Sequence, residues 1–146
     1  MITDPISLLK FEHAVLRVRF QVIKDCLSSE TGWKMLEATH YFIVNWHAKI
    51  EDKYVFPVLE KMGVNVKPLS NDHLLIEKYG DSVLKERRRD WAERYTRIVI
   101  DHNLNEEKIF PKQLGREVLK DILNDMKKFG GYSEFTGLSE YDLYAE

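Results

Sequence analysis

The feature that most constrains the fold is a spacing of apolar residues at alternating gaps of three and four, which recurs in successive segments of the chain. This spacing gathers apolar side chains on one side of an α-helix, and that side packs against neighbouring helices. No segment alternates apolar and polar residues as a half-buried strand does. The sequence therefore predicts an all-α protein, an up-down-up-down four-helix bundle.

The first two helices have clear signals at their ends. Asp4 can cap free backbone N–H groups and Pro5 suits a first helical turn, so the first helix is predicted to start there. The second is predicted to run from about Trp33 to Met62 and to end at Gly63. The inward positions are predicted to be Ile6, Leu9, His13, Leu16, Phe20, Ile23 and Leu27 in the first helix, and Trp33, Leu36, His40, Ile43, His47, Ile50 and Tyr54 in the second.

The third and fourth helices are predicted to follow in the same pattern. The third begins near Ser70 or Asn71 and reaches the arginine cluster at 87–89. Asp90 and Glu93 have the spacing of a capping box, so the fourth helix is predicted to begin there. Its predicted inward positions are Trp91, Tyr95, Ile98, His102, Asn105 and Ile109.

The remaining residues form a C-terminal extension of the same predicted domain. The 146 residues suit one domain, with the bundle at about 4–112 and a shorter fifth helix and a tail at 113–146. The fifth helix is predicted from Leu114 to Phe129. The last fifteen residues carry four acids, no bases and several aromatics, among them Tyr132, Phe135, Tyr141 and Tyr144. This tail is expected to pack on the bundle, to mediate self-association, or to be loose.

Composition excludes several partner classes. The 22 basic and 24 acidic residues give a formal charge of −2, so neither nucleic acid nor an anionic membrane is expected as a partner. Acids at 86 and 90 flank the basic cluster, which predicts a solvated helix end. Cys26 is the only cysteine, which excludes an intrachain disulfide and fits a reducing compartment. No secretory segment or apolar run of about 20 residues is visible. The prediction is a soluble cytoplasmic protein, a monomer or a homodimer.

All five histidines fall at predicted inward positions, which chance placement would not produce. A single buried histidine can satisfy both ring nitrogens with ordinary partners, but here each of the four helices carries at least one. The five are His13, His40, His47, His73 and His102.

Glutamates follow three of these histidines at a spacing of four residues, which places both side chains on one face of a helix. The pairs are His47 and Glu51, His73 and Glu77, and His102 and Glu106. Carboxylates in a bundle interior are costly unless a cation compensates their charge. Imidazole and carboxylate without thiolate suit iron, manganese or zinc, and the ligands outnumber the needs of one ion.

We therefore predict two metal ions, with four histidines as terminal ligands and with Glu51 and Glu106 bridging the ions. His40 lies two turns, about 10 Å, from His47, which favours a pocket-lining residue over a direct ligand. The predicted ligands are His13, His47, Glu51, His73, His102 and Glu106, with Glu77 as a further candidate.

Three segments carry a resemblance to a known family. Residues 4–13 begin an opening helix that carries the first histidine, and residues 47–57 read His-x-x-x-Glu-Asp followed by Phe-Pro. Residues 102–111 repeat that signature with one residue fewer before Phe-Pro, which leaves Glu106 and Glu107 as alternative ligands. Over about residues 4–112 the sequence resembles the hemerythrin-like family, the HHE cation-binding domains.

The resemblance implies a non-heme diiron centre with an oxo or hydroxo bridge, in which zinc or manganese could replace iron. Oxygen-carrying members usually place two histidines four residues apart on the third helix, whereas here Glu77 follows His73. The sequence is closer to the branch with four histidines and two bridging glutamates, known from proteins that repair iron centres or respond to nitric oxide and oxidants. Binding or sensing of dioxygen, nitric oxide or peroxide is therefore implied. The alternative is a diiron enzyme: an oxidase, a peroxidase or an iron-centre repair protein.

Other metal sites fit less well. Ferritin-like diiron proteins need Glu-x-x-His on two helices, and only Glu37 and His40 match that pattern. The His-Glu-x-x-His pattern of many zinc hydrolases is absent from the sequence.

Overall fold

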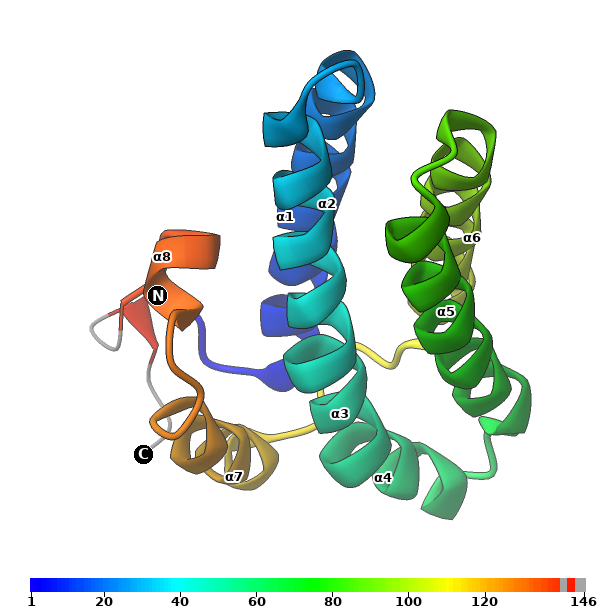
Figure 1. The fold of residues 1–146 in the computed structure, drawn as a ribbon. Helices are drawn as coiled ribbons and strands as arrows, with labels where there is room; N and C mark the ends of the chain where they lie inside the picture. The colour runs from blue at the N-terminus through cyan, green and yellow to red at the C-terminus, as the bar shows by residue number, and fades with distance from the viewer. Residues whose placement is uncertain (140–141, 144–146) are drawn as a thin grey trace.

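Four long helical stretches form the bundle (Figure 1), in a computed structural model that describes residues 1–139 and 142–143. Tyr141 and Tyr144 of the predicted tail lie outside the described residues. The first stretch is α1 (Pro5–Cys26), and the second joins α2 (Glu30–Phe42), η1 (Ile43–His47), α3 (Ala48–Ile50), η2 (Glu51–Val55) and α4 (Phe56–Lys61). The third and fourth are α5 (Lys67–Glu86) and α6 (Arg89–Ile109), followed by α7 (Arg116–Met126) and α8 (Tyr132–Thr136). The predicted helical bundle is confirmed.

Helix α1 follows its sequence signals closely. The Asp4 side chain accepts a hydrogen bond from the Ile6 N–H at 2.8 Å, which is the predicted cap. All seven predicted inward residues are buried. Glu12 is also completely buried, which the apolar pattern did not indicate.

The second stretch contains two π-helical turns: η1 ends at His47, and η2 begins at Glu51. The Ala48 N–H donates to the carbonyl of Ile43, and the Phe56 N–H to that of Glu51, so each turn holds one extra residue. An extra residue rotates the following side chains around the helix axis. The prediction of Tyr54 as an inward residue was therefore wrong, because Val55 and Phe56 are buried instead and Tyr54 is half-buried.

Helices α5 and α6 differ from the predicted pattern at their starts. Helix α5 begins at Lys67, about one turn before the predicted start. The predicted capping box of α6 was wrong, because the Asp90 carboxylate binds the guanidinium of Arg88, which itself occupies the cap position. The buried stripe of α6 lies one residue further along than predicted at three positions, where Ala92, Val99 and Glu106 are buried instead of Trp91, Ile98 and Asn105. The predicted inward residue Ile109 is exposed. The buried members of α6 are Ala92, Tyr95, Val99, His102, Asn103 and Glu106.

The C-terminal extension packs on the bundle, on the opposite side of the α1–α2 pair from α5 and α6 (Figure 1). Helix α7 is the predicted fifth helix in shorter form, and its Leu119 and Ile122 are fully buried. The Asp4 carboxylate accepts hydrogen bonds from the backbone N–H groups of Leu114 and Gly115, at 2.9 and 2.8 Å. The same residue thus caps α1 and holds the start of the extension.

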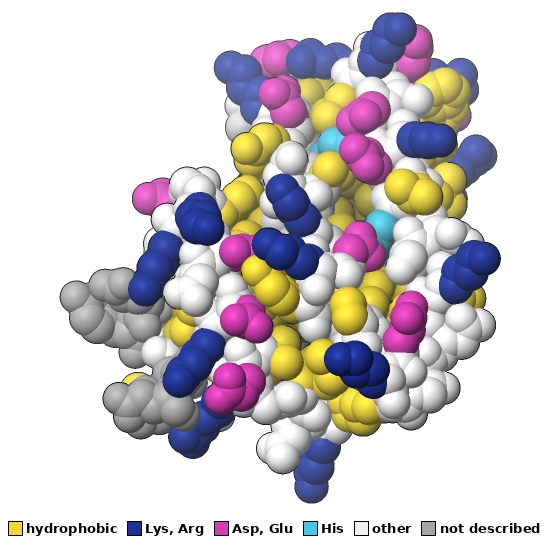
Figure 2. Space-filling view, turned by 90° about the horizontal axis from the view of Figure 1, so that it is seen from below, with side chains coloured by type: hydrophobic (Ala, Val, Ile, Leu, Met, Phe, Trp, Pro, Cys, Tyr) yellow, Lys and Arg dark blue, Asp and Glu magenta, His cyan; other side chains and the backbone are white. Residues whose placement is uncertain are grey.

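The face shown in Figure 2 mixes charges of both signs with apolar side chains, and histidine shows there only as small patches beside acidic groups. Arg87 pairs with Glu30, and Arg88 pairs with Asp90. Within the described residues, no helix combines the length and the apolar character that crossing a membrane requires.

Candidate metal centre

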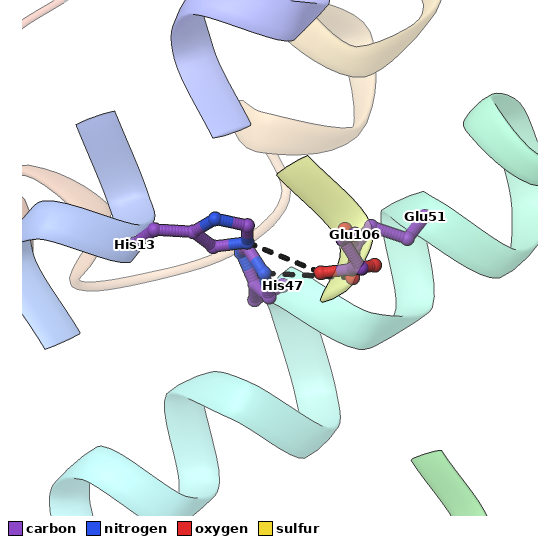
Figure 3. Close-up of side chains that lie close together, drawn as sticks. All are labelled: His13, His47, Glu51 and Glu106. Carbon is purple, nitrogen blue, oxygen red and sulfur yellow. Dashed lines mark ion pairs between the residues drawn. The ribbon is translucent and has the colours of Figure 1, made fainter. Parts of the chain in front are cut away.

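Six of the seven predicted ligands meet between the helices, in two groups that share two glutamates. One group is His13, His47, Glu51 and Glu106, and the other is Glu51, His73, His102 and Glu106. In each group, one candidate ligand atom from every residue lies within 4.8 Å of the others, and all six side chains are buried. Figure 3 shows His13 and His47 directed from α1 and η1 toward the two glutamates.

Each histidine presents its Nε2 atom to one of the shared carboxylates. The Nε2 to Oε1 distances are 3.2 Å for His13 to Glu106, 3.4 Å for His47 to Glu51, 3.2 Å for His73 to Glu51, and 3.5 Å for His102 to Glu106. Both glutamates therefore contact one histidine from each group, which places them between the two groups.

The other ring nitrogen, Nδ1, of every one of these histidines faces an outer carboxylate from a neighbouring helix. The distances are 2.8 Å from His47 to Glu12, 3.0 Å from His73 to Asp52, 2.9 Å from His102 to Asp72, and 2.9 Å from His13 to Glu107. Each of the four helical stretches thus supplies the carboxylate that binds the histidine of the next stretch in the chain. The fourth stretch supplies the carboxylate that binds the histidine of the first. This ring fixes the relative positions of all four helices at the level of the site.

The outer carboxylates also determine which ring nitrogen carries the proton. An ionised carboxylate only accepts hydrogen bonds, so each Nδ1–H donates to it and the neutral ring keeps a lone pair on Nε2. A histidine ligand typically donates its second N–H to such a partner, which orients the ring and makes it a better donor to the metal. All four rings have this arrangement.

Unpaired polar atoms at the centre show that the residues fit a cation. Nε2 of His13, Nε2 of His47 and both oxygens of Glu51 and of Glu106 are buried without a hydrogen-bond partner among the described residues. A buried polar atom without a partner costs about 1–3 kcal/mol. His73 Nε2 and His102 Nε2 lie 3.1 Å apart, so their two lone pairs face each other. Two nitrogens that bind one ion at right angles, each at about 2.1 Å, have a similar separation of about 3 Å.

The two shared glutamates cannot both ionise easily without a cation. Burial raises the pKa of Glu51 well above its ordinary value, and the charge of the nearby Glu106 raises it further. Burial opposes ionisation of Glu106 too, but its close contacts with Glu51, His102 and His13 outweigh burial and hold the pKa of Glu106 well below its ordinary value. The pair therefore retains a proton that a bound cation would displace.

The Phe-Pro signatures have a local role at the site. The Phe110 ring stacks on His13 with centroids 6.1 Å apart, and the Phe56 ring stacks on His73 at 5.3 Å. Each phenylalanine covers a histidine of another helix, so the signature contributes both a ligand and an apolar wall.

Glu77 is not brought to the centre, although it follows His73 by four residues. The buried stripe of α5 continues from His73 to Ile76, three residues on, which leaves Glu77 exposed on the flank of the helix. Glu106 rather than Glu107 faces the centre, which resolves the alternative that the shorter signature left open.

His40 lies outside both groups and has its own partners. Its Nε2–H donates to Asp81 at 2.9 Å, and its Nδ1 accepts from the Tyr95 hydroxyl at 2.6 Å. Burial raises the pKa of Tyr95, which keeps this hydroxyl a donor. A Cβ atom at Gly80 would lie 2.1 Å from the His40 ring, so only glycine fits there. The expectation that His40 is not a direct ligand agrees with this placement.

The outer carboxylates were not predicted from the sequence, although a signal for them exists. Each is a chain neighbour of a candidate ligand: Glu12 precedes His13, Asp72 precedes His73, Asp52 follows Glu51 and Glu107 follows Glu106. When a helical residue faces the centre of the bundle, the residue next to it in the chain faces an adjacent helix. An acid in that position can therefore reach the histidine of the adjacent helix.

The fold and the donor set together define a cation-binding helical bundle. Residues 4–114 match the family model described as the hemerythrin HHE cation binding domain, and the chain belongs to that family. No curated protein and no solved structure matches the chain. Helices α7 and α8 lie beyond the matched residues.

Proposed function

We propose that this protein is a non-heme diiron protein that binds or senses a small oxidant: dioxygen, nitric oxide or a peroxide. The observation that supports it best is the pair of donor groups that share Glu51 and Glu106, because each group supplies two imidazoles and two carboxylate oxygens to one ion. This set suits iron, while zinc or manganese could occupy the same ligands.

The two irons would supply exchangeable coordination and a change of oxidation state. The side chains of the protein would bind the ions and exclude water from them. The outer carboxylates hold four imidazoles in the ligating tautomer, and the shared glutamates neutralise charge between the ions. Phe56 and Phe110 exclude water from two of the imidazoles.

A surface pocket beside His73 offers a route to the site. Its volume is about 350 Å³, and it lies between α5 and the π-helical part of the second stretch. Apolar side chains of Ile43, Ala48, Leu74 and Ile76 line it, and its charged residues balance: Lys49 and Lys53 against Asp52 and Glu77. His73 is 8 % exposed, against 0 % for His13. We infer that small ligands reach the His73 side first, and that the apolar lining favours small neutral molecules.

The test is metal analysis together with absorption spectra of the reduced protein, recorded under anaerobic conditions before and after addition of dioxygen or nitric oxide. Two irons per chain and an oxo-bridge absorption band that appears on oxidation are expected. A reversible oxygenated spectrum would mark a binding protein, whereas sustained consumption of oxidant would favour the diiron enzyme. Fewer than one iron per chain after anaerobic loading would contradict the proposal.

We also propose that the protein is cytoplasmic and that it is a monomer or a homodimer. It is supported by the single cysteine and the mixed surface charge.

A further inference from the structure

Glu12 has the most buried environment of the four outer carboxylates. Its side chain is 0 % exposed, whereas the others are between 28 % and 45 % exposed. One of its oxygens accepts from His47 Nδ1 at 2.8 Å, and the other accepts from Trp46 Nε1 at 3.0 Å and from the Tyr132 hydroxyl at 2.8 Å. Three donors compensate for the loss of water around this carboxylate.

Tyr132 comes from α8, beyond the residues that match the family model. It is 4 % exposed, and its ring meets Trp46 edge-on with centroids 5.3 Å apart. Two further rings of the extension pack on the same face: Phe129 lies 5.4 Å from Trp46, and Phe135 stacks on Phe42 at 4.0 Å. The side chain that reaches Glu12 is therefore held by an aromatic contact with the second stretch.

The extension is also attached close to the shared glutamate Glu51. Asp125 of α7 accepts hydrogen bonds from the Tyr54 hydroxyl at 2.8 Å and from Lys53 Nζ at 3.1 Å, both on η2. Tyr132 and Asp125 thus contact the two ends of the segment that carries His47 and Glu51.

We propose that Tyr132 is a positioning residue for the metal centre: it holds Glu12, which orients His47, and it thereby couples docking of the C-terminal extension to metal affinity. The inference rests on the cation site and not on the identity of the oxidant. Without the tyrosine hydroxyl, Glu12 loses one of two donors on the same oxygen and can rotate away from His47 Nδ1. His47 then samples orientations and tautomers that do not present Nε2 to the ion.

The coupling has to act in both directions. If docking of the extension raises metal affinity by some factor, metal binding strengthens the docking by the same factor. The site would then signal its occupancy through α8, which lies at the edge of the molecule (Figure 1).

The test compares full-length Tyr132→Phe with Tyr79→Phe. Tyr79 is a matched control, because its buried hydroxyl has no hydrogen-bond partner among the described residues. Metal-free proteins are titrated with Co²⁺, the ¹⁵N shifts of the histidine rings are recorded, and amide exchange of Phe135 and Gly137 is followed with and without Co²⁺. These amides donate within α8 and its cap, to Gly131 and Ser133.

Tyr132→Phe is expected to weaken Co²⁺ binding about tenfold, the lower end of the range for residues that orient ligands. The His47 ring nitrogens should shift while those of His73 and His102 stay. Co²⁺ should slow amide exchange in α8 of the wild-type protein. In the variant, the factor by which Co²⁺ slows this exchange should be about ten times smaller. Tyr79→Phe should change none of these.

Equal Co²⁺ affinity in Tyr132→Phe and wild type would overturn the inference, and so would equal shifts of all four histidines. Neither result would affect the proposed function. Conversely, wild-type protein that binds Co²⁺ but does not react with any oxidant would remove the proposed function and leave this inference in place.

Discussion

The His13/His47 half and the His73/His102 half of the centre have the same donors in different surroundings. Each half combines two histidines with the shared Glu51 and Glu106. The first half is covered by α1, α6 and the C-terminal extension, and its histidines are at most 2 % exposed. The second lies beside a surface pocket, and its outer carboxylates, Asp52 and Asp72, are partly exposed. Equal ligand sets therefore need not give equal reactivity, because access depends on what packs outside them.

The largest effect is expected where the halves are joined. Glu51→Ala removes a ligand that both groups share, so both ions should be lost, with a fall in affinity of at least about a hundredfold. Metal content after dialysis against a weak chelator measures this. Glu77→Ala is the matched control, because Glu77 follows His73 as Glu51 follows His47 but is exposed. If Glu51→Ala keeps one ion with unchanged affinity, the halves do not share this residue.

A smaller effect is expected where the halves differ. Leu74 lines the pocket beside His73, and its neighbour Leu75 is similarly exposed but does not line it. Leu74→Trp should fill the pocket and slow binding of azide to the iron-loaded, oxidised protein about tenfold, at the lower end of the spread of association rates among variants of one binding site. Stopped-flow absorption measures the rate. Equal rates in Leu74→Trp and Leu75→Trp would mean that ligands enter by another route.

The smallest effect, taken per pH unit, concerns the proton that the two glutamates retain. The pKa of Glu51 is raised, so its proton must leave before a cation can bind, and it is held until the pH passes that raised pKa. Apparent metal affinity should therefore rise with pH up to the raised pKa of Glu51 and level off above it, by about tenfold or less per pH unit for one proton. Co²⁺ titrations from pH 5 to 8 measure the slope. Affinity independent of pH over this range would contradict the retained proton.

Sequence spacing was sufficient for the bundle and for the candidate ligands, because both depend on which residues share a helix face. The stripe of α1 was predicted fully, and six candidate ligands lie at the centre. One error arose where the helix period changes: the π-turns around His47 and Glu51 moved the buried positions from Tyr54 to Val55 and Phe56. Glu77 lies outside for another reason, because the regular buried stripe of α5 continues from His73 to Ile76, three residues on.

The rest of the site depends on contacts between distant segments, which spacing within one helix does not reveal. Glu12 is buried because Trp46, His47 and Tyr132 surround it, and Tyr132 lies 120 residues further along the chain. The only local signal of Glu12 is its place beside His13, and this does not indicate that Glu12 is buried. Its partners become visible only once the helices are packed.

The proposed metal centre requires two cations that share Glu51 and Glu106. Anomalous X-ray diffraction from crystals of the iron-loaded or cobalt-loaded protein tests it without reference to activity. We expect two peaks, one beside His13 and His47 and one beside His73 and His102, each in reach of both glutamates. A single peak, or a peak beside His40 and Asp81 instead, would contradict it.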